Sequence, residues 1–158
     1  MGRGLTGVSA GFAVSPIMAL PADFETLLRS SRAEGFGMLR MLHDEWSSGA
    51  NRFDLPGEAL VEARGSEGLA ALGGLNRDPY CGDPSVGRLR RVYVAPPARR
   101  RGVGRALVLH LLSHARRSFQ EVRLRTSNPE ADRFFRSLGF TATPADAFST
   151  HALRLPDS

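Results

Sequence analysis

The sequence lacks lysine, has one cysteine and contains no long apolar run, and each of these absences narrows what the protein can be. All 21 basic residues are arginines, and the formal net charge is +5. Arginine in place of every lysine, together with 17 glycines, is typical of a coding bias in a GC-rich genome. The positive charge is therefore weak support for a nucleic-acid surface, and we expect no nucleic-acid partner.

The single cysteine, Cys81, excludes an internal disulfide and a cysteine-rich zinc site. It favours a reducing, cytoplasmic setting. No segment approaches the roughly 20 apolar residues of a membrane-spanning helix, so we expect no membrane partner. A chain of 158 residues with 42% hydrophobic and 23% charged residues is typical of one globular domain.

The first residues differ in composition from the rest of the chain. Residues 1–16 are rich in glycine, serine and alanine, and we predict a flexible leader there, followed by a single domain at 17–158. Only Arg3 supplies positive charge, and glycine, serine and proline interrupt the apolar run, which argues against a signal peptide. A later start at Met18 is the alternative.

Apolar periodicity and turn residues predict an alternation of helices and strands. Asn128 is a good helix N-cap, because Pro129 follows at the first helical position and Glu130 lies near the positive end of the helix. The predicted order is helices at 22–33 and 36–46, strands at 59–63, 69–75 and 89–94, a helix at 103–119, a strand at 121–126, a helix ending near 138, and strands at 140–143 and 151–155.

A glycine- and arginine-rich turn joins the strand at 89–94 to the following helix. The free amides at a helix N-terminus attract anions, and glycine lets a phosphate approach the backbone. The dinucleotide fingerprint fails because Leu107 replaces its third glycine, and no Gly-Lys-Ser/Thr of a P-loop is present. We predict a diphosphate site formed by Arg99, Arg100, Arg101, Gly102, Val103, Gly104 and Arg105.

A second motif identifies the diphosphate ligand. Residues 128–140 read NPEADRFFRSLGF, which resembles the N-x-x-A-x-x-F-Y-x-x-x-G-F motif of the GNAT acetyltransferase superfamily. The R-x-x-G-x-G loop and the strand before it resemble that family's other signature, and both motifs occur in the expected order. The resemblance implies an α/β fold of three layers, in which helices cover both faces of a mixed central sheet.

In that family the sheet is splayed between its fourth and fifth strands, here 89–94 and 121–126, and acetyl-CoA enters the wedge. By this resemblance the backbone of Val92 and Val94 meets the thioester and pantetheine, and Asn128 contacts pantetheine. The family usually has tyrosine at the position of Phe135, where its hydroxyl can protonate the departing thiolate. Phenylalanine has no proton to donate, so Phe135 indicates either core packing in an active enzyme or a loss of activity.

Acyl transfer to an amine also needs a base, because an ammonium group has no lone pair. Glu62 is the best candidate by its element, and the other candidates are Asp44, Glu45 and His151. His110 and His114 lie one turn apart on the apolar helix, but no third ligand is apparent, so we expect no metal.

The resemblance implies an enzyme, a GNAT-type N-acetyltransferase that moves an acetyl or other acyl group from acetyl-CoA to a primary amine by direct attack in a ternary complex. The acceptor is a small-molecule amine or a protein amine, and a homodimer is suggested only by analogy with relatives. The alternative is a non-catalytic acyl-CoA-binding or sensing domain, which Phe135 favours. A nucleic-acid module rests on charge alone, and it predicts salt-sensitive DNA binding that CoA does not compete away.

Overall fold

The computed structural model describes residues 7–9, 11–143 and 147–156. These residues form one eight-stranded sheet in the order β1-β2-β3-β4-β5-β6-β8-β7. Neighbouring strands are antiparallel except for the parallel pair β5 and β6. The strands are β1 (Gly7–Ser9), β2 (Phe12–Ile17), β3 (Ala59–Gly65), β4 (Gly68–Arg77), β5 (Val86–Val94), β6 (Glu121–Leu124), β7 (Thr141–Ala142) and β8 (His151–Arg154), and the helices are α1 (Phe24–Ala33), α2 (Met38–Ser48), α3 (Val103–Ala115) and α4 (Pro129–Ser137).

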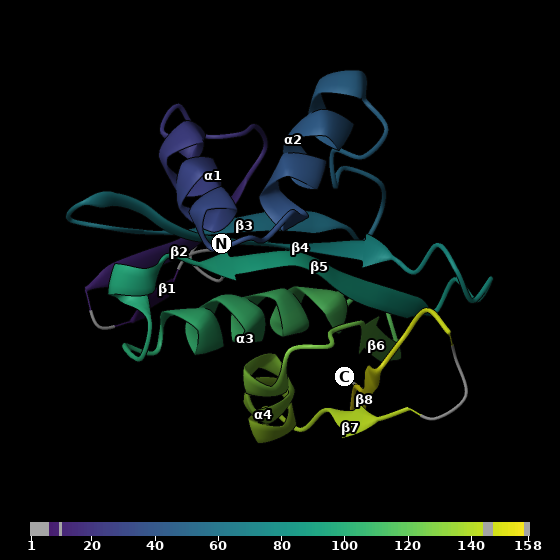
Figure 1. The fold of residues 1–158 in the computed structure, drawn as a ribbon. Helices are drawn as coiled ribbons and strands as arrows, with labels where there is room; N and C mark the ends of the chain where they lie inside the picture. The colour runs from purple at the N-terminus through teal and green to yellow at the C-terminus, as the bar shows by residue number, and fades with distance from the viewer. Residues whose placement is uncertain (1–6, 10, 144–146, 157–158) are drawn as a thin grey trace.

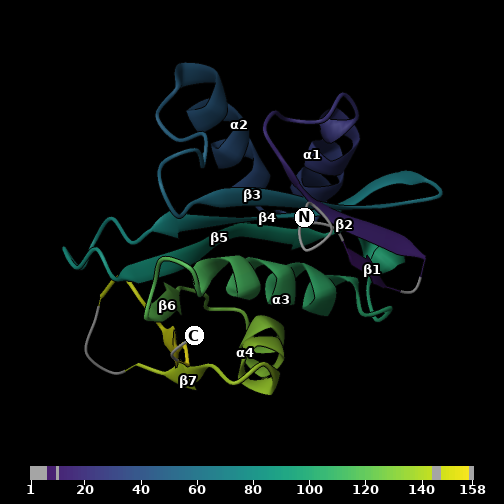
Figure 2. The same cartoon turned by 180° about the vertical axis from the view of Figure 1, so that it is seen from behind.

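Helices α1 and α2 cover one face of the sheet, and α3 and α4 lie on the other (Figures 1 and 2). The apolar stripes of α1 and α2 pack on β3, β4 and β5 and form one hydrophobic core, which contains Leu27, Leu39, Leu42, Leu60 and Leu72. The larger core lies between the sheet and α3, where Leu107 and Leu111 are fully buried. The predicted three-layer α/β fold with a mixed sheet is therefore confirmed.

Most predicted elements are present, and their ends shift by a few residues. Helix α3 ends at Ala115 rather than at residue 119, and the chain then turns back toward β6. The predicted N-cap of α4 is confirmed, because the Asn128 side chain accepts hydrogen bonds from the amides of Glu130 at 2.8 Å and Ala131 at 3.3 Å. Among the described residues no helix has the length and apolar character needed to cross a membrane.

The prediction of a flexible leader up to residue 16 is wrong for the segment that forms β2. Phe12–Ile17 pairs along its length with β3, and Phe12 and Val14 are buried in the core on the α3 side. The alternation of these two apolar residues with exposed ones is a strand signal, but the small and breaking residues around it obscured the pattern. Gly11, at φ 85°, permits the tight turn before β2. Residues 1–6 and 10 of the predicted leader lie outside the described part of the chain.

The sheet opens between β5 and β6, the strands that the resemblance named as the family's fourth and fifth. Their pairing covers only Val86–Arg88 of β5 and Glu121–Arg123 of β6. Beyond Arg88 the two strands separate. A bulge in β5, where Arg91 has φ 60° and the register against β4 shifts, twists the strand just after this point.

Candidate active site

A cleft of about 1260 Å³ occupies the place where β5 and β6 separate. One wall is the second half of β5 with the loop that follows it, and the opposite wall is the end of β6 with the start of α4. Residues before and within α2 and the first turn of α3 also line the cleft. The cleft therefore connects the positive end of a helix with the gap in the sheet.

The first turn of α3 presents free backbone amides. Its N-cap is Gly102, which has φ 79° and no side chain to cap the helix, so the first amides of α3 lack a side-chain acceptor. Arg100 also has a positive φ, 63°, and the loop thus turns sharply twice before the helix. A Cβ atom on Gly104 would lie 3.3 Å from a Val94 methyl carbon, so glycine keeps this corner of the cleft open. Together these features form an anion site.

The structure separates the residues of the predicted diphosphate loop. Arg100, Gly102, Gly104 and Arg105 line the cleft. Two others do not line it: the guanidinium of Arg101 lies 5.1 Å from the centre of the Phe12 ring, toward β2, and the Val103 side chain is buried in the core. The turn at Gly102 points consecutive side chains in different directions, so Arg101 and Val103 are left to contribute to the predicted site through their backbone rather than their side chains.

Arg99 lines the cleft, but its guanidinium already pairs with protein groups. Its guanidinium makes two hydrogen bonds to Glu34 at 2.8 and 2.6 Å, and its Nε donates to the Val94 carbonyl at 2.9 Å. The Tyr93 hydroxyl donates to the same Glu34 carboxylate at 2.6 Å and lies 2.8 Å from the hydroxyl of Ser30. Arg99, and secondarily Tyr93, hold the pKa of Glu34 below its usual range. This network fastens the C-terminal end of α1 to the loop.

The remaining predicted cofactor residues all line the cleft. Val92 and Val94 lie on β5, and Asn128 and Phe135 belong to the cap and body of α4. The Phe135 ring packs edge-on against Phe134, with centres 5.0 Å apart, and against Phe140 at 5.5 Å. Phe135 thus packs in the core, and its surface also forms part of the cleft.

The placement of Glu62 does not support its role as a base. Glu62 lies on β3, separated from β5 by β4, and does not line the cleft. Its carboxylate pairs with Arg64 at 3.2 Å, and Arg64 also binds Asp23 at 2.9 Å. The hydrogen bond from Arg64 is the main reason why the pKa of Asp23 falls to about 2. This ion-pair network joins β3 to the start of α1.

The other base candidates also lie outside the cleft lining. Asp44 is exposed beside Arg40, and Glu45 pairs with a β5 arginine at 2.9 Å. His151 is buried, with its Nε2 2.6 Å from Asp132 and its Nδ1 2.8 Å from a threonine hydroxyl. Among the described residues that line the cleft, Glu130 has the only carboxylate.

The histidine pair on α3 gains no further ligands in the fold. Burial, and then the charge of His114, lower the pKa of His110. No group of three or more histidine, cysteine, aspartate or glutamate side chains among the described residues could hold a metal ion.

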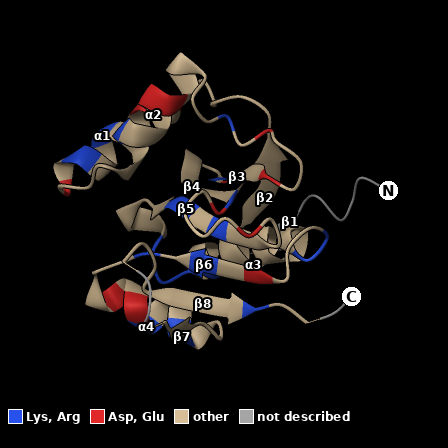
Figure 3. Ribbon diagram, turned by 90° about the vertical axis from the view of Figure 1, so that its right-hand side faces the viewer, with Lys and Arg blue, Asp and Glu red and all other residues tan. Residues whose placement is uncertain are grey.

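The part of the cleft along the first half of β5 was not predicted from the sequence, and arginine and aromatic side chains line it. Arg88 and Arg90 line it together with Tyr80 and Phe148, whose rings stack 4.5 Å apart. In the ribbon coloured by charge, arginine segments lie on both β5 and β6 (Figure 3). Adjacent arginines at 90 and 91 within an otherwise apolar strand were the signal available in the sequence.

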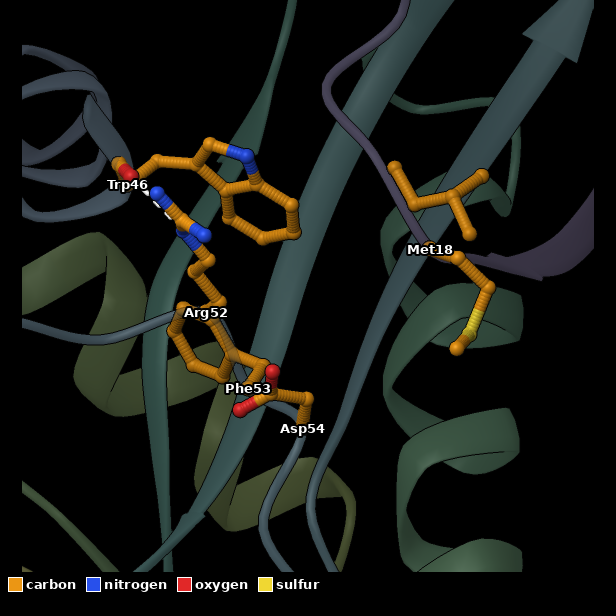
Figure 4. A pocket seen from close by; sticks show the side chains of 6 residues that line it. Met18, Trp46, Arg52, Phe53 and Asp54 are labelled. Atoms are coloured by element: carbon orange, nitrogen blue, oxygen red, sulfur yellow. Dashed lines mark hydrogen bonds between the residues drawn. The ribbon is translucent and has the colours of Figure 1, made fainter. Parts of the chain in front are cut away.

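A second, smaller pocket of about 240 Å³ lies between the end of α2 and the chain after β2. Figure 4 shows Trp46, Arg52 and Phe53 on one side and Met18 on the other. Arg52 donates to the backbone carbonyl of Trp46 at 3.0 Å, so this side chain serves the local structure. The described residues that line this pocket include no first turn of a helix and no residue of β5 or β6, and we assign it no site.

Comparisons with known proteins agree with this geometry. Residues 22–140 match the model of the Acetyltransferase (GNAT) family. A solved structure from Exiguobacterium sp. 255-15 that carries an acetyltransferase assignment has a TM-score of 0.79 and 29% sequence identity, covering 90% of this chain and 93% of that one. A comparison with curated proteins finds no match.

More distant structures share the fold. An acetyltransferase from Streptococcus agalactiae 2603 has a TM-score of 0.74 at 17% identity and covers 92% of this chain and 99% of that one. The GNAT domain of S. lividans PAT has a TM-score of 0.71 at 18% identity, covering 95% and 96%. With the family match over residues 22–140, the open β5–β6 edge and the free helix amides have one explanation: the chain belongs to the GNAT acetyltransferase family.

Proposed function

We propose that the protein transfers an acetyl group from acetyl-CoA to a primary amine by direct attack in a ternary complex. The observation that carries the proposal is a single cleft that runs from the uncapped amides of α3 to the gap between β5 and β6. One end suits a diphosphate. The cleft as a whole, at about 1260 Å³, leaves room for a second substrate.

The pyrophosphate binds at the first turn of α3. The amides of residues 103–105 donate to its oxygens, and Arg100 and Arg105 supply charge at the rim. Arg99 contributes indirectly, because its ion pair with Glu34 holds the loop in place.

The pantetheine arm lies along the open edge of β5. From Leu89 onward this edge pairs with no strand among the described residues, and an unpaired strand edge accepts an extended chain. Backbone groups of Val92 and Val94 are the partners that the extended arm would meet.

In the transfer step the amine nitrogen attacks the thioester carbonyl carbon, the C–N bond forms, and the C–S bond breaks to release a thiolate. Phe135 cannot protonate the sulfur, but a thiol with a pKa of about 8.5 leaves readily near neutral pH. Among the described residues only Glu130, in the first turn of α4, brings a carboxylate to the cleft, and we propose that the proton of the attacking nitrogen passes to water instead. The pH dependence of kcat/KM should then follow the pKa of the amine used.

The second candidate function is acyl-CoA binding without turnover. It is favoured by Phe135 at the usual tyrosine position and by a described cleft lining in which Glu130 supplies the one carboxylate and no histidine is present. The two candidates predict the same affinity for acetyl-CoA and differ only in the release of free CoA when an amine is supplied.

Calorimetric titration of acetyl-CoA tests the shared part of both functions. We expect binding by the natural protein and a loss of at least 100-fold in Gly104→Glu, because the new carboxylate lies against the phosphate site and adds bulk near Val94. Gly104→Ala is the matched control, and its smaller Cβ contact predicts a loss below about tenfold. Equal binding by the Glu variant would refute the site. Thiol release with a panel of primary amines then separates the transferase from the binding domain.

A further inference from the structure

Seven arginines and one glutamate line the cleft in the described part of the chain, and most of these arginines already have a partner or a clear role. Arg88 pairs with Asp78, Arg91 with Glu45 and Arg99 with Glu34. Arg125 donates to the Ala147 carbonyl. Within the described residues no protein acceptor is seen for Arg90, Arg100 and Arg105, of which the last two flank the α3 turn.

Arg90 lies away from that turn. It precedes the end of β5 by four residues, which places it about 13 Å along the strand from Val94. It pairs with Gly74 of β4, which in turn pairs with Leu60 of β3, and Leu60 belongs to the core under α1 and α2. Residues directly opposite each other share a face of the sheet. Arg90 therefore points toward the α2 side of the cleft.

The environment of Arg90 is costly for an unpaired cation. The side chain is half-buried, and burial, followed by the neighbouring charge of Arg91, lowers its pKa. No carboxylate among the described residues pairs with it. Arg88 and Arg91 on either side have their acidic partners, so Arg90 differs from two neighbours in the same strand. A partly buried charge without a counter-ion loses part of its hydration, and an incoming anion compensates for that loss.

Apolar side chains line the same cleft as this cation. Phe36, Met38 and Met41 come from the α2 side, and the stacked rings of Tyr80 and Phe148 come from the loops that flank β5 and β8. Among the described residues that line the cleft, Arg90 is thus the one arginine away from the α3 turn for which no protein acceptor is seen, and it shares the cleft with apolar side chains, which suits a small ligand with one anionic group.

We propose that the acceptor is a small amine that carries a carboxylate, and that Arg90 binds this carboxylate and so determines specificity. The inference rests on the proposed function, since it assigns the acceptor of the same cleft. A bidentate pair between the guanidinium and the carboxylate holds the molecule at the α2 side. Its amine then points toward Val92, where the open edge of β5 receives the thioester. A neutral amine of equal size lacks this anchor.

The test compares amines that differ only in this group: L-phenylalanine against L-phenylalaninamide, and L-leucine against L-leucinamide. The amide of each pair has the less basic amine, which by itself favours the amide. We expect the natural protein to show a kcat/KM at least about tenfold higher for the carboxylates. In Arg90→Gln this ratio should fall to near one, and Arg90→Lys should give an intermediate ratio, because lysine keeps the charge but loses the fork.

The control variant is Arg29→Gln, because Arg29 is an exposed residue of α1 that does not line the cleft. We expect this variant to keep the ratio of kcat/KM values that the natural protein shows. A natural protein without preference for carboxylates would overturn the proposal. So would a drop of equal size for both members of each pair in Arg90→Gln, since that pattern means that Arg90 stabilises the reacting carbonyl instead.

A binding measurement separates this inference from the proposed function. N-acetyl-L-phenylalanine and its amide are titrated into the CoA-bound protein, with and without Arg90→Gln. If the acid binds, its amide does not, and Arg90→Gln abolishes binding of the acid, the Arg90 site is supported even if no amine is turned over. In that case only the transferase proposal fails. Equal binding of acid and amide refutes the Arg90 site whatever the turnover.

Discussion

Arg101 and Arg105 look equivalent in the sequence, yet the structure predicts opposite effects of replacing them. Arg105 lines the cleft beside the α3 amides, whereas Arg101 lies over Phe12 outside it. We expect Arg105→Gln to weaken acetyl-CoA binding and leave stability unchanged. Arg101→Gln should lower stability and leave binding unchanged.

The magnitudes follow from exposure. Arg105 is exposed, so its interaction with a phosphate is screened and contributes about 1 kcal/mol, or about a fivefold change in Kd. Replacing Arg100 as well should bring the loss to about 2 kcal/mol, or about 30-fold. Loss of the cation–π contact between Arg101 and Phe12 should lower the free energy of unfolding by about 0.5–1 kcal/mol.

Calorimetric titration at 0.1 M salt gives the Kd values, and urea unfolding gives the stabilities. At 0.5 M salt the Arg105 effect should shrink, because added ions shorten the screening length from about 10 Å at 0.1 M toward about 3 Å at 1 M. A loss of affinity in Arg101→Gln as large as in Arg105→Gln would refute the assignment of separate roles. Unchanged affinity in the double variant of residues 100 and 105 would refute the phosphate site itself.

Three further changes test other parts of the structure. Phe135→Tyr should raise kcat about tenfold at pH 7, because a positioned proton donor accelerates such steps by about 10²–10⁴-fold at best; an unchanged kcat would show that protonation of the sulfur does not limit turnover. Gly74→Ala should lower the free energy of unfolding by about 1–3 kcal/mol, since its Cβ would lie 2.3 Å from a Phe53 ring carbon; an unaffected denaturant midpoint would contradict this packing. Asp23, with its pKa lowered to about 2 chiefly by the hydrogen bond from Arg64, stabilises the fold above pH 4, and this contribution disappears as the pH falls from about 4 to about 2. Urea unfolding should show a smaller loss over that window in Asp23→Asn, and an equal loss would contradict the assignment.

The sequence alone determined the fold and one half of the site. Local signals carried this part: the apolar stripes of α1, α2 and α3, the cap at Asn128, and the two glycines at the start of α3. Each depends on residues close together in the chain, whose spacing fixes backbone conformation and which face is buried. The motifs around residues 99–105 and 128–140 therefore identified the family before any long-range contact was known.

Strand β2 and the ends of the sheet were less predictable. A strand is stabilised by partners distant in sequence, so the weak alternation of Phe12 and Val14 has meaning only beside β3. For the same reason β5 begins at Val86, earlier than its apolar pattern indicates, because β4 and β6 both pair there.

Only the tertiary structure decided which side chains reach the cleft. The turn at Gly102 directs Arg101 away from it, and the pairing of β3 with β4 separates Glu62 from it. In the described part of the chain, the acids supplied by distant elements pair with Arg88 and Arg91, and Arg90 between them pairs with none. Composition gives the number of charged residues. A charged side chain is available to a ligand only when the fold pairs the nearby opposite charges with other residues.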